Sequence, residues 1–156
     1  MNNTNKIKLI FSALSKNEAF ARNVISCFAL PLNPSVAELS DIKTAVSEAV
    51  TNSIVHAYEK NSGEIILEAE IIDNTLHINV FDSGVGIDDL DQALQPFYTT
   101  KPQEERSGMG FTIMQSFMDE LSIESVLNLG TKITMKKSMK QNLKDTKKPN
   151  NICITA

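Results

Sequence analysis

The chain has 156 residues, of which 42% are hydrophobic, and a formal net charge of −4. A chain of this length can bury a core as one domain without disulfides or metals. No apolar run is long enough to span a membrane and no long apolar stretch follows the N-terminus, so the sequence predicts a cytoplasmic protein without a secretory signal. Cys27 and Cys153 lie far apart and indicate neither a disulfide framework nor a metal site.

The charge is distributed unevenly along the chain. Residues 1–135 contain 18 acidic and 9 basic residues, whereas residues 136–156 contain six lysines and one acid, Asp145. Because neutralising phosphates requires a basic surface, the acidic part argues against direct nucleic-acid binding. We predict one domain over residues 1–140, followed by a lysine-rich, disordered tail over residues 141–156.

The beginning of the chain predicts a strand and then a helix. Residues 7–11 are mostly apolar and predict the strand. The residues after Lys16 predict the helix, with Arg22 on the surface and facing away from the apolar stripe. A Leu-Pro-Leu-Asn-Pro segment at residues 30–34 ends the helix, because proline cannot continue it. The stripe consists of Phe20, Val24, Cys27 and Phe28.

A longer helix is predicted from about Ser35 to Tyr58. On it, Glu48, Asn52 and His56 are four residues apart and share one face. An isolated face of this kind is usually solvated, and His56 alone indicates a capping or core residue. The same spacing also lets Asn52 hold a metal while Glu48 takes a proton. The stripe that faces the core consists of Leu39, Ile42, Ala45, Val46, Ala49, Val50, Ile54 and Ala57.

Two paired strands are predicted in the middle of the chain. They cover residues 64–72 and 76–81, and a tight turn at Asp73 and Asn74 makes them antiparallel. The second strand leads into the segment Asp82-Ser83-Gly84-Val85-Gly86. Two glycines at a strand end serve either a tight turn or a ligand that lies against the backbone. The segment alone is compatible with both.

The last third predicts a short helix at residues 88–94, a long loop, a second helix and two strands at 121–126 and 131–137. The segment Ser107-Gly108-Met109-Gly110 opens the second helix. Backbone N–H groups and the helix dipole favour an anion there, although ordinary helices also begin with glycines. The elements together predict an α+β fold in which helices cover one face of a mixed, mostly antiparallel sheet.

The candidate motifs follow one another in a recognisable order. Glu-x-x-x-Asn on a helix is followed by Asp-x-Gly-x-Gly after a strand, Gly-x-Gly at a helix start, and Gly-Thr between two strands. In this order they resemble the GHKL ATPase/kinase superfamily, whose Bergerat fold is a two-layer sandwich that binds ATP. The sequence contains neither a phospho-accepting histidine hairpin nor a transducer domain, which argues against a histidine kinase, a gyrase or a MutL protein.

A closer resemblance covers residues 14–22, 46–52, 96–102 and 105–114. These segments resemble the anti-sigma-F factor family of spore-forming bacteria. The resemblance implies a protein that inhibits a sporulation sigma factor and uses Mg-ATP to phosphorylate a serine of a STAS-type anti-anti-sigma protein. It also implies a homodimer in which ATP and ADP states differ, with no membrane partner.

The resemblance implies roles for residues at the base and the metal. Asp82 would accept a hydrogen bond from the adenine amino group, and Thr131 would support that contact directly or through water. Gly84 and Gly86 would let the backbone pass beneath the base. Asn52 would hold Mg²⁺ against the phosphates.

Further roles concern phosphoryl transfer and the partner. Glu48 would be the general base for the substrate serine, and Arg22 would lie at the protein interface, where a guanidinium suits pairing with a carboxylate. A lid would consist of Thr99, Thr100 and Lys101. The phosphates would rest on Arg106, Ser107, Gly108, Met109, Gly110 and Phe111.

Two alternatives remain open at this point. One is a nucleotide-gated sigma-binding module without kinase activity. The other is the related kinase and anti-sigma protein that regulates a general-stress sigma factor. The Glu-Arg-Ser-Gly-Met-Gly-Phe run at residues 105–111 favours the sporulation member.

Overall fold

The computed structural model describes residues 5–58, 62–98 and 108–140. Its strands lie close to the predicted ranges and are β1 (Asn5–Ser12), β2 (Glu64–Ile72), β3 (Thr75–Asp82), β4 (Glu120–Val126) and β5 (Gly130–Ser138). Its α-helices are α1 (Glu18–Ala29), α2 (Val36–Asn52), α3 (Leu90–Ala93) and α4 (Gly110–Phe117). Short 3₁₀ turns at Ser15–Asn17 and Leu30–Leu32 flank α1.

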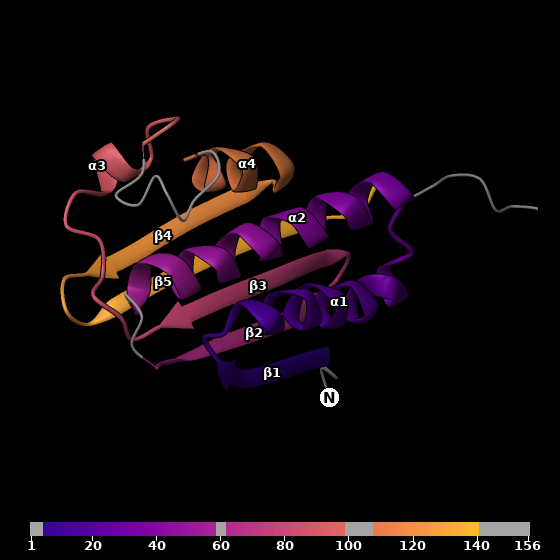
Figure 1. Ribbon diagram of the computed structural model, residues 1–156. Helices are drawn as coiled ribbons and strands as arrows, with labels where there is room; N and C mark the ends of the chain where they lie inside the picture. Colours follow the sequence, from indigo (N-terminus) through magenta and orange to yellow (C-terminus); the bar gives the residue numbers. More distant parts are fainter. Residues whose placement is uncertain (1–4, 59–61, 99–107, 141–156) are drawn as a thin grey trace, which may run out of the picture.

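In the described part of the chain, five strands form one sheet in the order β1-β2-β3-β5-β4, and each neighbouring pair is antiparallel. Helices α1, α2 and α4 lie over the same face of this sheet (Figure 1). This two-layer arrangement confirms the predicted α+β fold class. None of the helices in the described ranges has the length and hydrophobicity needed to cross a membrane.

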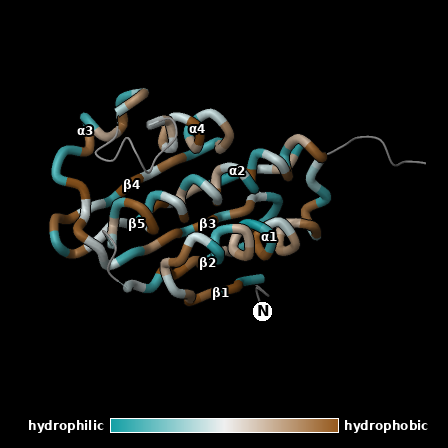
Figure 2. Tube along the Cα trace, viewed as in Figure 1, coloured by the Kyte–Doolittle hydropathy of each residue, from teal (hydrophilic) through white to brown (hydrophobic). Residues whose placement is uncertain are grey.

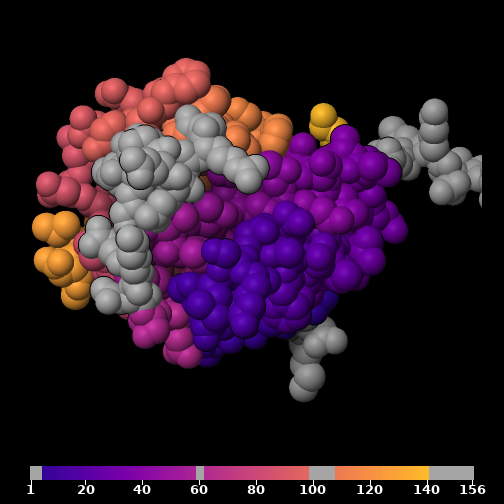
Figure 3. All heavy atoms as spheres, in the orientation of Figure 1, coloured from indigo at the N-terminus to yellow at the C-terminus, as the bar shows by residue number. Residues whose placement is uncertain are grey.

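The core lies between the helices and the sheet. Ile42, Val46 and Val50 of α2 are fully buried, as are Leu67 of β2 and Ile78 of β3. Buried residues recur at the helical period on α2 and at every second residue on the strands, because these are the periods that keep side chains on one face. Figure 2 shows hydrophobic and hydrophilic residues alternating along β3. In the space-filling view, α1 and α2 form a continuous surface beside the α3 and α4 region (Figure 3).

The predicted apolar stripe of α1 is only partly correct: Phe28 packs against the core, but the fully buried face of the helix is a different one. Ala21, Ile25 and Ala29 are fully buried, whereas Phe20 is 55% exposed and Cys27 is exposed. Alanines on the inward side let α1 approach α2 closely, so the small residues pack inside and the larger ones remain outside. A pattern built on large hydrophobic residues therefore selects the wrong face of this helix.

Helix α2 begins as predicted and ends earlier. At its start the hydroxyl of Ser35 accepts a hydrogen bond from the backbone N–H of Glu38 at 3.2 Å, and the Glu38 carboxylate accepts one from the Ser35 N–H at 2.7 Å. After Asn52 the chain continues as a π-helix over Ser53–Ala57. Such wide turns are rare and are frequent at functional sites.

Glu38 also anchors the end of the last strand. Its Oε1 accepts a hydrogen bond from the backbone N–H of Lys140 at 2.9 Å. Nearby, the Lys137 Nζ donates to Asp41 Oδ2 at 3.1 Å and to the Phe117 carbonyl at 2.6 Å. The hydrogen bonds from Lys140 and then from Ser35 hold the pKa of the buried Glu38 below its usual value. The N-terminal end of α2 is thereby tied to β5.

We predict that Glu38→Gln lowers the free energy of unfolding at pH 7 by about 1–2 kcal/mol, because a hydrogen-bonded carboxylate at a helix start becomes a neutral amide. Since folding lowers the pKa of Glu38, its contribution is present above the unfolded-state value of about 4.3 and is lost as pH falls through the folded value. Urea denaturation at pH 7 and at about pH 3 measures both effects. Glu124→Gln, which alters an exposed ion pair with Lys132, is the control. Equal stability of the Glu38 variant and the parent at pH 7 would contradict this account.

Candidate functional site

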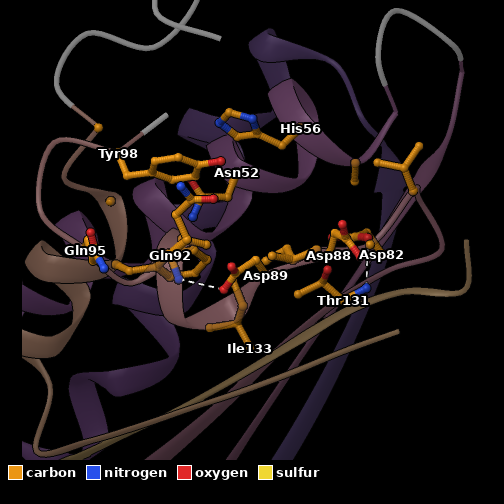
Figure 4. Close-up of a pocket in the computed structure, with 18 of the residues that line it drawn as sticks. Asn52, His56, Asp82, Asp88, Asp89, Gln92, Gln95, Tyr98, Thr131 and Ile133 are labelled. Atoms are coloured by element: carbon orange, nitrogen blue, oxygen red, sulfur yellow. Dashed lines mark hydrogen bonds between the residues drawn. The ribbon is translucent and has the colours of Figure 1, made fainter. Parts of the chain in front are cut away.

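A cavity of about 350 Å³ lies between the C-terminal end of the long helix, the loop after β3, α3 and the start of α4 (Figure 4). The cavity brings together residues from motifs that are far apart in the sequence. Seven of the predicted site residues line it, namely Asn52, Asp82, Gly86, Gly108, Gly110, Phe111 and Thr131.

Asp82 lies at the centre of a hydrogen-bond network at one end of the cavity. Its Oδ1 accepts from the backbone N–H groups of Gly84 at 3.2 Å and Thr131 at 3.1 Å. Its Oδ2 accepts from the hydroxyl of Ser53 at 2.8 Å. Burial raises the pKa of Asp82, and these hydrogen bonds, first that of Ser53, oppose the rise. The carboxylate is therefore held by three donors from three different segments.

The loop after Asp82 lies tightly against the π-helix. The backbone N–H of Val85 donates to the Ala57 carbonyl at 2.9 Å. A Cβ added at Gly84 would lie 2.2 Å from that same carbonyl oxygen. Glycine is required at this position because no side chain fits between the loop and the helix. The predicted close backbone approach at Gly84 is thus an approach to Ala57.

Ser125 connects the other side of the loop to the sheet. Its hydroxyl accepts a hydrogen bond from the backbone N–H of Ile87 at 2.8 Å and lies 2.8 Å from the Thr131 hydroxyl. The same oxygen is 3.2 Å from the Gly130 carbonyl. Ser125 therefore supports both the loop and Thr131 from behind the cavity wall.

At the other end of the cavity, the start of α4 meets α2. A Cβ added at Gly110 would lie 3.1 Å from Asn52 Oδ1 and 3.1 Å from Glu48 Oε2. The helix start, with its backbone N–H groups, thus lies directly beside the carboxylate and the carboxamide. Phe111 and Thr112 of the first turn of α4 also line the cavity. N–H groups at a helix start attract anions, so this end of the cavity suits phosphate groups.

Apart from Arg22, the remaining predicted residues fall into two groups. Gly84 contributes its N–H to Asp82, Glu48 lies beside Gly110, and Met109 precedes α4 as its N-cap residue. The lid residues and part of the predicted phosphate cradle lie outside the described residues, namely Thr99, Thr100, Lys101, Arg106 and Ser107.

Several contributors were not predicted from the sequence. Ser53 and Ser125 support the Asp82 end, and the Tyr58 hydroxyl accepts from the Ser83 N–H at 2.9 Å. His56 and Tyr98 line the cavity near Asn52 (Figure 4), although His56 alone indicated a capping or core residue. The two serines left a readable signal, since each is a polar residue at a position where the periodic pattern expects an apolar one.

Arg22 lies on α1, away from the cavity lining. Its Nη1 is 3.2 Å from Glu18 Oε1 and 3.5 Å from the Ser47 hydroxyl, and Ser47 donates a hydrogen bond to Glu18. The side chain is 41% exposed, so Arg22 lies at the surface, where its ion pair with Glu18 holds it. Because Ser47 precedes Glu48 on α2, this network links α1 to the helix that carries the site.

The comparison with known proteins agrees with this geometry. The histidine kinase-like ATPase domain family matches residues 11–137. A protein named anti-sigma F factor from Caldanaerobacter subterraneus subsp. tengcongensis is 51% identical over 91% of this chain and 99% of its own length. A protein of the same name from Clostridium perfringens is 54% identical over 86% of this chain and 97% of its own length.

The chain belongs to the anti-sigma F factor family. This confirms the resemblance drawn from the ordered motifs. The histidine kinase-like ATPase domain implies nucleotide binding, and the cavity between Asp82 and Gly110 is where the family motifs meet. Within the described residues no group of three or more His, Cys, Asp or Glu side chains is arranged to hold a metal ion.

We predict that ATP affinity falls as pH is lowered through the raised pKa of Asp82. An ionised carboxylate accepts a hydrogen bond from the adenine amino group, whereas the protonated form offers a donor instead. Calorimetric titrations across the acidic range measure the change. Inosine triphosphate, which carries the same phosphates but no amino group, controls for titration of the phosphates. Equal pH dependence of both nucleotides would remove Asp82 from base recognition.

Proposed function

We propose that the chain is a cytoplasmic, homodimeric anti-sigma factor and serine kinase. It binds Mg-ATP, inhibits a sigma-F-type sporulation sigma factor and phosphorylates a serine of a STAS-type anti-anti-sigma protein. The observation that carries the proposal is one cavity with Asp82 at one end and the meeting of Glu48, Asn52 and Gly110 at the other. The names of the relatives, anti-sigma F factor, support the sigma-factor partner.

The Asp82 end suits an adenine. A carboxylate offers about four acceptor sites, and three donors already occupy Asp82. The remaining acceptor capacity matches the amino group of adenine. Guanine presents a carbonyl oxygen at the equivalent position and would face a second acceptor. This arrangement supports ATP over GTP as the nucleotide.

The Gly110 end suits the triphosphate and Mg²⁺. The N–H groups at the start of α4 would donate hydrogen bonds to the phosphate oxygens, and the lid residues Thr99, Thr100 and Lys101 are proposed to lie above them. Asn52 would hold Mg²⁺ through its neutral oxygen, which fits an ion whose other ligands are phosphate oxygens and water. When bound, Mg²⁺ neutralises charge on the phosphates. Arg106 and Ser107 would complete the cradle.

Glu48 is the proposed general base. Its carboxylate lies beside the start of α4, where the γ-phosphate would end. The hydroxyl oxygen of the substrate serine forms a bond to the γ-phosphorus, and the bond from that phosphorus to the β–γ bridging oxygen breaks. The hydroxyl proton passes to Glu48, and ADP leaves.

Arg22 is the proposed contact for the protein partners. Its guanidinium is partly exposed and already pairs with Glu18, so a partner carboxylate could add to or replace this pair. The hydrogen bonds to Ser47, which directly precedes Glu48, give the partner surface a physical connection to the nucleotide site. The ATP-bound and ADP-bound forms of the protein would then present different lid contacts and so bind different partners.

The proposal is tested by incubating the chain with γ-labelled ATP and a STAS-type partner, and by assaying the partner for phosphoserine. We predict transfer by the parent and a loss of about 10²–10⁴-fold in Glu48→Gln, with ATP binding retained, because only the proton acceptor is removed. Glu124→Gln, which alters an exposed carboxylate that does not line the cavity, is the matched control.

Each contrary outcome has its own meaning. Unchanged transfer in Glu48→Gln would exclude Glu48 as the base. Absence of phosphoserine with the parent, together with ATP-dependent capture of a sigma factor, would leave a nucleotide-gated binding module. Capture of a general-stress sigma factor instead of a sigma-F-type one would favour the related stress regulator.

A further inference from the structure

Ser53 directly follows α2, at a position where the apolar period of that helix would place an apolar residue. The buried stripe of the helix runs through Val46, Ala49 and Val50, and Ser53 continues it with only 2% of its surface exposed. We propose that Ser53 is a positioning residue for base recognition, whose hydroxyl orients the Asp82 carboxylate so that the site selects adenine over 6-oxopurines. This inference rests on the proposed ATP binding.

The direction of the hydrogen bond is determined by the chemistry of the two groups. An ionised carboxylate can only accept, so the hydroxyl proton of Ser53 points to Asp82 Oδ2, 2.8 Å away. The other acceptor near Ser53, the carbonyl of Ala49, is 3.5 Å distant. Ser53 therefore donates its single proton to Asp82.

The hydrogen bond from Ser53 holds Oδ2, the carboxylate oxygen of Asp82 that receives no backbone N–H in the contacts described above. The N–H groups of Gly84 and Thr131 both donate to Oδ1, whereas the hydroxyl of Ser53 donates to Oδ2. Removing the hydroxyl would leave the carboxylate held at Oδ1 alone, so the whole group could turn further about its Cβ–Cγ bond. The acceptor that faces the cavity would then lose its defined direction.

The π-helix explains why Ser53 can reach Asp82. Ser53 is the first residue of this wide turn, directly after the regular part of α2 ends at Asn52. The last residue of the turn, Ala57, accepts the N–H of Val85 from the loop that follows Asp82. The turn thus contacts the Asp82 segment at both of its ends. The backbone contact between Ala57 and Val85 holds the two segments together independently of the hydrogen bond between Ser53 and Asp82.

Loss of Ser53 should change which base the site prefers. Burial already raises the pKa of Asp82, and without the Ser53 hydrogen bond it would rise further. A protonated Asp82 offers a donor, which matches the carbonyl oxygen of hypoxanthine rather than the amino group of adenine. Among the residues that the structure describes, the other ionisable groups that line the cavity are His56, Asp88, Asp89 and Tyr98, and all of them remain in the variant.

The test compares the affinities of Mg-ATP and Mg-inosine triphosphate for the parent and for Ser53→Ala by calorimetry. We expect the variant to bind ATP about tenfold more weakly, as for loss of a hydrogen bond to a charged group, and to bind inosine triphosphate no more weakly than the parent does. The ratio of the two affinities therefore falls. A purely structural defect would weaken both nucleotides together.

Two further variants complete the experiment. Thr44→Ala removes a hydroxyl from the same helix that bonds only to the backbone of Ser40, and it should leave the ratio unchanged. Ser53→Thr keeps a hydroxyl and should restore the parental ratio. A parent that selects ATP and a folded Ser53→Ala variant with the same selectivity would overturn the inference. A parent that binds no ATP would instead overturn the proposed function.

Discussion

The structure depends on the way the Asp82 carboxylate is held. Donors from three segments converge on it: the hydroxyl of Ser53 from the π-helix, the N–H of Gly84 from the loop after β3, and the N–H of Thr131 from β5. A partly buried carboxylate is costly unless it is hydrogen-bonded, so these donors are needed for stability. In the proposed function, the same contacts that fold the loop also define which hydrogen-bonding group of a ligand is accepted.

Helix α2 connects this network to the rest of the molecule. Its N-terminal end is tied to β5 through Glu38 and Lys140, and its buried stripe packs on the sheet that carries Asp82 and Thr131. Its C-terminal half carries Glu48 and bears on the start of α4. Since the helix is anchored to the sheet over its length, the core sets the distance between the Asp82 end and the Gly110 end of the cavity. Nucleotide recognition and folding therefore share one scaffold.

Much of the site could be predicted because each motif is a short run with its own backbone requirement. A side chain at Gly84 would collide with the Ala57 carbonyl, and one at Gly110 would press against Glu48 and Asn52. Glycines after a strand or before a helix are visible in a sequence. The inward face of α1 could not be predicted in this way, because the close approach to α2 favours Ala21 over the larger Phe20. The sequence shows Ser53 as a polar residue in an apolar stripe, but it does not show the π-helix that brings this residue to Asp82, so Ser53 was assigned no role. Long-range contacts, not local propensity, decided these cases.

The central claim is that a purine lies at Asp82 with its phosphates at the start of α4. A crystal structure of the chain grown with Mg-ATP tests it most directly. The account predicts an adenine amino group about 3 Å from Asp82 and a triphosphate against the N–H groups that begin at Gly110. A nucleotide bound outside this cavity, or one whose amino group points away from Asp82, would contradict it.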